Sequence, residues 1–371
     1  MPRIGYDVTS LVGMCTGVGN YTRQLLAHML DVAGEHDFLL LANRQDAVQD
    51  VAPSAHARPM IHDFPSRMLW MQTVLPADLR AAKADLCHYP NSIAPLRSPC
   101  RYVVTIHDMT LSLLPQYHPW RKRMIVRPLI PLIARRAARI ITVSEHARAD
   151  IVRLLRVPPE RVVVVPEAAA AIFCTASATE QARVREQYRL ARPYLLYVGT
   201  LEPRKNLVRL IRAWHTLWQR GVIPHQLVLV GGRGWQDAAI YATIAQLNCG
   251  DALRLAGYVP TADLPALYSA ADAFAFPSLS EGFGLPVIEA MACGTPVLIS
   301  TAPALRELAG AAALAVDPRD ERALTNALEQ LLTDAALRAD LRARGLQRAA
   351  AFSWERAARS TLAVYQEALT T

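Results

Sequence analysis

The sequence predicts an α/β protein with two doubly wound domains, each a parallel sheet covered by helices. Short apolar runs of strand length alternate with longer amphipathic segments along nearly the whole chain. The length of 371 residues suits two domains. Hydrophobic residues make up 52% of the chain and charged residues 19%, so each domain has enough apolar material for a buried core.

In the N-terminal half, residues 1–170, apolar runs predict strands and two intervening segments predict helices. Apolar positions recur at helical spacing over Gly19–Val32, and Ser144 is a typical N-cap for a helix that extends to Arg156. The expected strands are Arg3–Val8, Phe38–Leu41, Tyr102–Ile106, Arg139–Val143 and Arg161–Val165. A looser segment over Pro166–Arg192, which includes the Ala-rich run Ala168–Ala171, comes next and suits a linker, placed at residues 171–192, plus a lead-in helix.

The same alternation restarts at Tyr194, so residues 193–353 are expected to form the second domain. Its expected strands are Tyr194–Gly199, Gln226–Val230, Leu253–Ala256, Asp272–Phe276 and Pro296–Ile299. Its expected helices are Leu207–Arg220, Asp237–Leu247, Thr261–Ala270, one that begins near Pro286, and more from Glu321 onward. Ligands of such sheets bind beyond the carboxyl ends of the strands, so a central cleft between two facing domains is the expected site.

The excess positive charge is concentrated in one region. Between Pro119 and Arg161 there are eleven basic and three acidic residues, and this difference equals the whole net charge of +8. A solvated helical face explains the pattern, and so does a surface for anionic lipid headgroups, which Trp120, Met124 and Ile125 among the charges favour. Nucleic acid is a weaker interpretation because no recognition motif accompanies the region, and no such partner is expected.

Several classes of protein are not indicated. No apolar stretch reaches the ~18 residues of a membrane-spanning helix, and the N-terminus lacks the apolar core of a secretory signal. The six cysteines include no C-x-x-C pair. The expected location is therefore the cytoplasm, with peripheral attachment to the inner face of the plasma membrane as an option. No D-x-D, H-E-x-x-H, G-x-S-x-G or P-loop pattern occurs, so neither a metal nor a bound cofactor is expected.

The most informative motif runs from Ser278 to Val297, as a strand end, a Gly-rich loop, a helix and the next strand. Pro286 suits the first helical position, and the amides of Phe283, Gly284 and Leu285 at this helix start could face an anion. Two carboxylates, Glu281 in the loop and Glu289 in the first helical turn, could accept hydroxyl groups of a ribose and a hexose. A structural Gly/Pro turn with a dipole-favoured Glu is the alternative explanation.

A second motif, Tyr197–Leu207, places two cations after a strand. Arginine outnumbers lysine by 37 to 3 in this chain, so Lys205 beside Arg204 is a notable choice of residue. Two adjacent cations at the end of a parallel strand would neutralise a diphosphate, although solvated loop charge is the simpler explanation. Asn206 is expected to cap the next helix.

Two weaker motifs lie in the first domain. Gly17 and Gly19 come after the first strand but lack the third glycine of a dinucleotide fingerprint. His107 and Asp108 stand at the carboxyl end of another strand, where a structural pair and a substrate contact are about equally favoured.

Taken together, these motifs resemble the retaining GT-B glycosyltransferases of family four, the group 1 transferases, and especially bacterial polysaccharide mannosyltransferases. Glu281 to Glu289 matches the E-x7-E pattern of the family, and Ala290–Val297 matches the family's next segment. Supporting matches occur over Gly17–Tyr21, Thr105–Asp108, Val143–His146, Gly199–Asn206, Gly257–Val259, Ala309–Gly310 and Asp317–Pro318, so the resemblance covers nearly the whole chain.

The resemblance implies two Rossmann-like domains, a metal-independent hexosyltransferase with retention, and a role for each matching residue. Lys205 and Arg204 would hold the donor diphosphate, Glu289 the ribose, Glu281 the sugar hydroxyls, and His107 would contact the sugar near the reacting carbon. The remaining donor contacts would come from Gly17, Gly19, Thr200, Tyr258, Val259, Phe283, Gly284 and Leu285. The helix over 354–371 would pack back onto the N-terminal, acceptor-side domain.

The implied reaction moves a hexose from a nucleotide sugar to a glycan or lipid-linked acceptor in cell-surface polysaccharide synthesis. Mannose from GDP-mannose is the first expectation, and a UDP- or dTDP-sugar is the second. One departure concerns the first strand of the second domain, where many members have arginine after the glycine and this chain has Thr200.

Three different functions are also compatible with parts of the sequence. The first is a non-catalytic nucleotide-sugar or polyanion-binding module on the same fold, against which the intact Lys205, Glu281 and Glu289 argue. The second is an NAD-dependent oxidoreductase, for which the full glycine fingerprint is missing. The third is a pyridoxal phosphate phosphorylase, for which none of the three lysines has a matching context.

Overall fold

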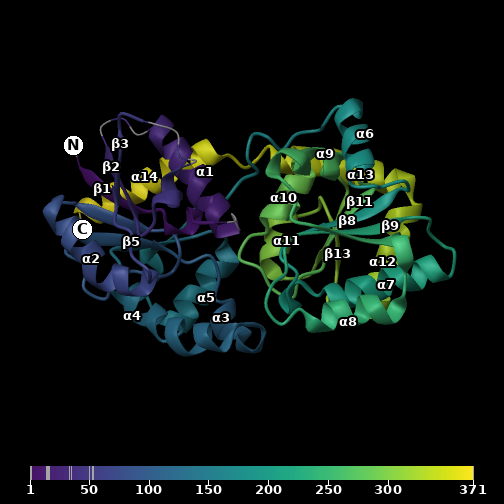
Figure 1. Ribbon diagram of the computed structural model, residues 1–371, viewed down its shortest axis with the longest axis horizontal. Coiled ribbons are helices and arrows are strands. Elements are labelled where there is room, and N and C mark those ends of the chain that lie inside the picture. The colour runs from purple at the N-terminus through teal and green to yellow at the C-terminus, as the bar shows by residue number, and fades with distance from the viewer. Residues whose placement is uncertain are drawn as a thin grey trace. The chain divides into compact units, whose positions relative to one another are not determined.

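The computed structural model describes residues 2–13, 17–32, 34, 36–49, 51 and 54–370, which form two compact units. The first unit draws on residues 1–113, 120–167 and 353–371, and the second on residues 114–119 and 168–352. Each unit is a parallel sheet with helices packed against it (Figure 1). The predicted fold class, α/β with two doubly wound parallel sheets, is therefore confirmed.

The sheet of the first unit has seven parallel strands in the order β3-β2-β1-β4-β5-β6-β7. Their bounds are β1 Arg3–Asp7, β2 Asp37–Ala42, β3 Ala57–Ile61, β4 Leu86–Tyr89, β5 Arg101–Thr105, β6 Arg139–Thr142 and β7 Val162–Val164. The inner strands are buried on both faces, which explains why they are continuous apolar runs rather than alternating ones.

Helices between and after these strands cover the first sheet. They are α1 Gly17–Asp31, α2 Arg67–Ala81, α3 Thr110–Leu113, α4 Leu129–Arg136, α5 Glu145–Leu155 and α14 Trp354–Thr370. The Ser144 side chain accepts a hydrogen bond from the Ala147 amide, so the predicted cap of α5 is confirmed. Helix α14 packs on α1 and against β5, which brings the end of the chain onto the first unit (Figure 1).

The second unit has six parallel strands in the order β10-β9-β8-β11-β12-β13. The strands are β8 Tyr194–Val198, β9 Gln226–Val230, β10 Leu253–Gly257, β11 Ala273–Phe276, β12 Val297–Ser300 and β13 Leu314–Val316. The helices are α6 Ala178–Gln187, α7 Leu207–Gln219, α8 Ala238–Leu247, α9 Leu264–Ser269, α10 Leu285–Ala292, α11 Pro303–Ala309, α12 Glu321–Thr333 and α13 Ala335–Ala349. Helix α6 lies within segment 166–192, so the lead-in helix predicted there is confirmed.

In both sheets the strand order reverses beside the first strand. In the second unit, β8 pairs with β9 on one side and with β11 on the other, so the connections leaving β8 and β11 diverge. Loops at such a reversal leave an opening beyond the carboxyl ends of the strands. The two motifs in the second half of the sequence, around Lys205 and Glu281, are the loops after β8 and β11.

Candidate functional site

The loops after β8 and β11 lie against each other in the second unit. The Leu279 amide donates to the carbonyl of Arg204 (2.9 Å), which joins the two loops through their backbones. The loop after β9 packs closely as well, because a Cβ on Gly231 would lie 2.0 Å from the carbonyl oxygen of Gly199. These backbone contacts fix the side chains that the loops carry.

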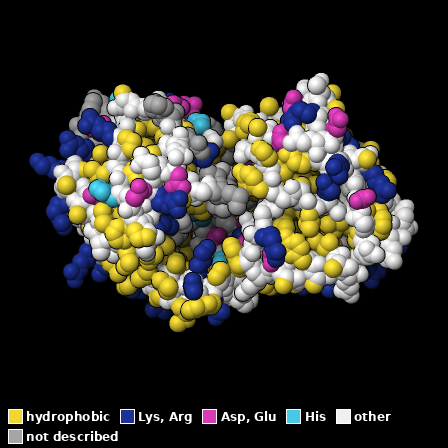
Figure 2. All heavy atoms as spheres, in the orientation of Figure 1, with side chains coloured by type: hydrophobic (Ala, Val, Ile, Leu, Met, Phe, Trp, Pro, Cys, Tyr) yellow, Lys and Arg dark blue, Asp and Glu magenta, His cyan; other side chains and the backbone are white. Residues whose placement is uncertain are grey.

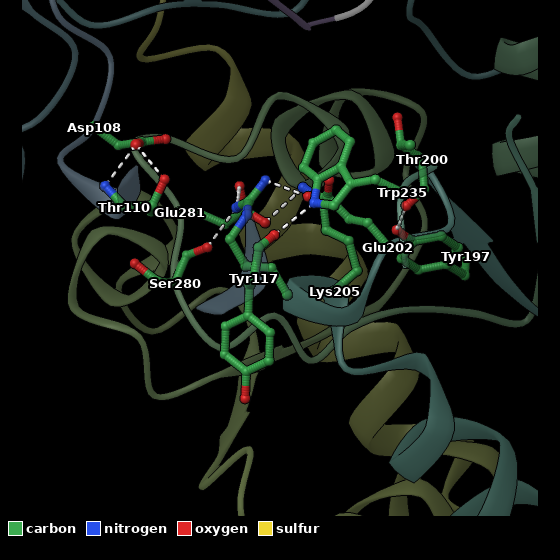
Figure 3. A network of polar contacts seen from close by, with 11 residues as sticks. Asp108, Thr110, Tyr117, Tyr197, Thr200, Glu202, Lys205, Trp235, Ser280 and Glu281 are labelled. Carbon is green, nitrogen blue, oxygen red and sulfur yellow. Dashed lines mark hydrogen bonds and ion pairs between the residues drawn. The ribbon is translucent and has the colours of Figure 1, made fainter. Parts of the chain in front are cut away.

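An ion-pair cluster of four side chains occupies this junction, as Figure 3 shows for Lys205, Glu281 and Glu202. Lys205 Nζ lies 2.7 Å from Glu281 Oε1, and Arg204 Nη1 lies 2.9 Å from Glu281 Oε2. Arg204 Nη2 lies 2.6 Å from Glu202 Oε1. Lys205 and Glu281 are 76 positions apart in the sequence, so the two motifs are brought into contact by the fold. In the cluster, two cations are held by two carboxylates.

Burial and charge act in opposite directions on these groups. Burial raises the pKa of Glu281, but Arg204 and Lys205 outweigh it and bring that pKa down to about 2. Burial, together with the charge of Arg204, lowers the pKa of Lys205, although Glu281 and Glu202 act to raise it. The Lys205 ammonium also lies over the ring of Phe276, 4.9 Å from its centroid. Glu281 is thus a carboxylate throughout the physiological pH range.

The Asn206 side chain does not cap helix α7 as the sequence predicts. Asn206 stands at the N-cap position of α7, but in a left-handed conformation and without capping the helix through its side chain. Its amide instead donates to the carbonyls of Pro277 (3.1 Å) and Pro318 (2.7 Å), and its oxygen accepts from Arg209. The predicted side-chain cap is wrong, because this amide bridges the loops after β11 and β13.

The Gly-rich loop ends at the start of helix α10. The helix begins at Leu285, so Pro286 is its second residue rather than the predicted first. Gly284 has φ +115°, and a Cβ there would lie 2.7 Å from a Leu305 methyl group, so only glycine fits. Phe283 is buried edge-on against Phe352. The first amides of a helix have no acceptor within it, so this helix start offers donors for an anion.

Glu289 lies further along α10 than predicted, as its fifth residue rather than in its first turn. It is buried, and the hydroxyl of Tyr268 donates to its Oε2 (3.1 Å). Tyr268 is itself fully buried in α9. Neither Tyr268 nor Glu202 was predicted from the sequence, although an acid two residues before a pair of cations was a usable signal for Glu202.

Three further predicted positions also belong to the second unit. Tyr258 comes after β10 and is 54% exposed, whereas Val259 beside it is buried. The carbonyl of Thr200 accepts a hydrogen bond from the buried Tyr197 hydroxyl (3.1 Å). Trp235, which no motif indicated, donates to the carbonyl of Tyr117 in the same unit (2.5 Å; Figure 3).

The remaining predicted residues belong to the first unit. Gly17 is exposed at the first residue of α1, and Gly19, two residues later, is buried. His107 comes after β5, and its ring contacts both Glu167 and Pro90. Asp108 accepts from the amide and the hydroxyl of Thr110, which forms a local turn (Figure 3).

The basic residues of region 119–161 have two kinds of surroundings in the structure. Several of its arginines make structural contacts: Arg136 with the Leu96 carbonyl, Arg139 with Glu367, Arg148 with Glu145, Arg153 with Asp150, and Arg161 with the Ala134, Arg135 and Ala137 carbonyls. The segment 120–127 differs, because its apolar side chains Trp120 (66%), Met124 (70%) and Ile125 (52%) are exposed among basic ones. Figure 2 shows hydrophobic and basic side chains together over the α3–α4 part of this unit.

Comparison with known proteins identifies related sequences over both units. The profile described as "Glycosyltransferase Family 4" matches residues 15–169, and the one described as "Glycosyl transferases group 1" matches residues 179–348. O-antigen chain mannosyltransferase B of Escherichia coli is 34% identical over 95% of this chain and 96% of its own length. The serotype-specific mannosyltransferase WbdA of Escherichia coli is 26% identical over 94% of this chain, which spans 46% of that longer protein.

Among solved structures, the sucrose-phosphate synthase of Thermosynechococcus elongatus superposes with a TM-score of 0.79, covering 99% of this chain and 98% of its own. Its sequence identity is 24%, so this match speaks to the fold, which is GT-B. The predicted resemblance is confirmed by the two family matches, by the similarity to O-antigen chain mannosyltransferase B over nearly its whole length, and by the shared fold. The chain belongs to the group 1 glycosyltransferases of family four.

Proposed function

We propose that this chain transfers mannose from GDP-mannose to a growing cell-surface polysaccharide, with retention of configuration. The sugar and the polysaccharide are suggested by its relatives, which are named as O-antigen and serotype-specific mannosyltransferases. The observation that carries the donor site is the cluster of Lys205, Arg204 and Glu281 at the strand-order reversal of the second sheet.

The chemistry depends on the charge that develops in the reaction. As the glycosidic bond of the donor breaks, negative charge grows on the leaving diphosphate and positive charge on the sugar. Lys205, Arg204 and the amides of Phe283, Gly284 and Leu285 would stabilise the diphosphate. Glu281 would hold sugar hydroxyls, Glu289 the ribose, and Tyr258, Val259 and Thr200 the nucleotide end. His107, Gly17 and Gly19 of the first unit keep their proposed roles toward the sugar and diphosphate.

The direct test is an assay with a panel of GDP-, UDP- and dTDP-sugars and an acceptor glycan that carries a lipid or an aromatic tag. We expect product only with GDP-mannose, and an α-linked mannose by NMR, since the donor is α-configured and the configuration is retained. A product from a UDP- or dTDP-sugar instead would assign a different donor. Binding of nucleotide sugars without any transfer or hydrolysis would indicate the non-catalytic module.

We further propose that no metal ion is needed, because Lys205, Arg204 and the amides of a helix start would contact the diphosphate oxygens in its place. Activity should be unchanged after dialysis against EDTA and should not rise when Mg²⁺ or Mn²⁺ is restored. Loss of activity on chelation with recovery on adding one of these ions would contradict this proposal.

The exposed apolar and basic side chains of segment 120–127 are proposed to hold the protein on an anionic membrane. No helix in the described part of the chain is long and apolar enough to cross a bilayer. Trp120 and Met124 would enter the headgroup region while the surrounding arginines meet acidic lipids.

Flotation with vesicles of phosphatidylglycerol and phosphatidylcholine should show salt-sensitive binding. The double variant Trp120→Ala/Met124→Ala should lose most of it, whereas Leu346→Ala, which removes an exposed leucine of the second unit, should not. Equal flotation of both variants would contradict a docking role for this segment.

A further inference from the structure

Two histidines of the first unit, the buried His88 and the half-buried His107, have hydrogen-bond partners that differ in kind. His88, on β4, contacts two hydroxyl groups: Nε2 lies 2.8 Å from Thr105 Oγ1, and Nδ1 lies 2.6 Å from the Tyr365 hydroxyl of α14. A hydroxyl can donate or accept, so a neutral imidazole satisfies both contacts. In agreement with this, burial and then the nearby charge of His107 lower the pKa of His88 to about 3.

The two partners of His107 are of a different kind from those of His88. The Nε2 of His107 lies 2.9 Å from the carbonyl oxygen of Pro90, and its Nδ1 lies 3.2 Å from Glu167 Oε1. A backbone carbonyl only accepts hydrogen bonds, and so does a carboxylate. Both ring nitrogens can donate to these two acceptors only if each carries a proton, as in an imidazolium paired with the Glu167 carboxylate.

The surroundings of this pair hold it in place. The Tyr21 ring meets the imidazole edge-on, with centroids 4.6 Å apart and planes at 88°. The Tyr21 hydroxyl lies 3.0 Å from Thr105 Oγ1, which in turn contacts His88. Glu167 is 5% exposed. Pro90, His107 and Glu167 come after β4, β5 and β7. Through its two hydrogen bonds, His107 therefore connects three loops at the carboxyl end of the sheet.

We infer that His107 is a fixed cation rather than a proton-transfer group, and that Glu167 is the positioning residue that sets its charge. Both N–H groups are committed to protein acceptors, so neither nitrogen is available to take up or release a proton during the reaction. The role of this cation in sugar transfer depends on the proposed function, but its charge state does not.

The pH dependence is set by the groups that face His107. Burial lowers its pKa, but the hydrogen bond and charge of Glu167, the Pro90 carbonyl and the charge of Asp108 together raise it above the ordinary value. The facing groups are Glu167, Asp108, Tyr21 and His88. A histidine whose pKa is higher in the folded protein stabilises the fold fully below its unfolded pKa, and this stabilisation is lost as pH rises through the folded value.

The test compares Glu167→Gln with Glu160→Gln, which changes an exposed glutamate seven residues earlier. Glutamine keeps an oxygen to accept from Nδ1 but removes the charge. In full-length protein with ¹³Cε1-labelled histidine, assigned with His107→Gln, wild-type His107 should be an imidazolium at pH 7. In Glu167→Gln its titration should move to lower pH by at least about one unit, while Glu160→Gln stays like the wild type.

The activity of the same variants reports on the consequence. The alkaline limb of kcat should move to lower pH in Glu167→Gln by the same amount as the NMR titration, with activity near that of the wild type retained at the acidic end. Glu167→Asp, which keeps the charge, should restore the limb. A merely structural role would instead lower activity equally at every pH, and that result would overturn the positioning role.

A neutral His107 ring at pH 7 in the wild type, or an unchanged titration in Glu167→Gln, would overturn the inference itself. If the chain transferred no sugar, the proposed function would fail while the NMR titration could still come out as expected. The two failures are therefore distinguishable. Should Glu167→Gln not fold, Glu167→Asp and the wild-type titration still decide the charge state of His107.

Discussion

Lys205→Ala is expected to lower kcat by about a hundredfold to a thousandfold while the protein stays folded. The ammonium is one of two cations at the junction of the loops after β8 and β11, and its attraction for the donor increases as the diphosphate leaves. The alanine side chain leaves Glu281 paired with Arg204, so the carboxylate keeps a counter-charge.

Steady-state kinetics with GDP-mannose and circular dichroism would measure this effect. Lys205→Arg should recover part of the lost kcat because it restores the charge, although its planar guanidinium fits a single contact poorly. Arg212→Ala removes an exposed cation from α7, next along the chain, and should leave kcat unchanged. Turnover near that of the wild type in Lys205→Ala would rule out the proposed role.

Glu281→Gln is expected to have an effect of similar size through two physical routes. The donor would lose a charged acceptor for its sugar hydroxyls, and Lys205 and Arg204 would lose the carboxylate that holds both in place. Removing one partner of a buried pair leaves the other charge uncompensated, which destabilises a fold by up to about 3–5 kcal/mol. We therefore expect at least a hundredfold loss of kcat together with a lower Tm.

Stability as a function of pH separates the two routes. Glu281 has a pKa of about 2 in the folded protein, below its ordinary value of 4.5. A carboxylate of this kind stabilises the fold above its unfolded pKa and ceases to do so as pH falls through the folded value. Wild-type protein should thus lose stability between about pH 4.5 and 2 more steeply than Glu281→Gln. The matched control Glu186→Gln, an exposed glutamate on α6, should behave like the wild type. Parallel pH curves for Glu281→Gln and wild type would contradict this coupling.

The sequence predicted those elements whose local pattern is strong. Strands such as Tyr194–Val198 and Gln226–Val230 are continuous apolar runs bounded by turn residues, and Ser144 marks its helix start through a local hydrogen bond. The short strands β3, β4 and β13 and helix α2 gave no clear periodic signal and were not predicted. Neighbouring strands, rather than their own sequences, define these three strands.

The candidate site was likewise predictable in part, where its signal was local in the sequence. The motifs around Lys205 and Glu281 were recognisable because a strand end, glycines and charges succeed one another locally. That the two side chains form an ion pair 2.7 Å across depends on β8 and β11 being neighbours, which is a property of the sheet. For the same reason the Asn206 cap was predicted wrongly, since its actual acceptors lie 71 and 112 residues away.

The sequence by itself determined the fold class and the family and suggested most of the residues proposed to carry charge to the donor, since these rest on local patterns. Only the tertiary structure decided which acceptors surround His107, that Glu167 pairs with it, and that Tyr268 holds Glu289. The physical reason is that hydrogen bonds between distant segments depend on which strands and helices pack together. Such contacts set the charge and orientation of a side chain, and no spacing along the chain encodes them.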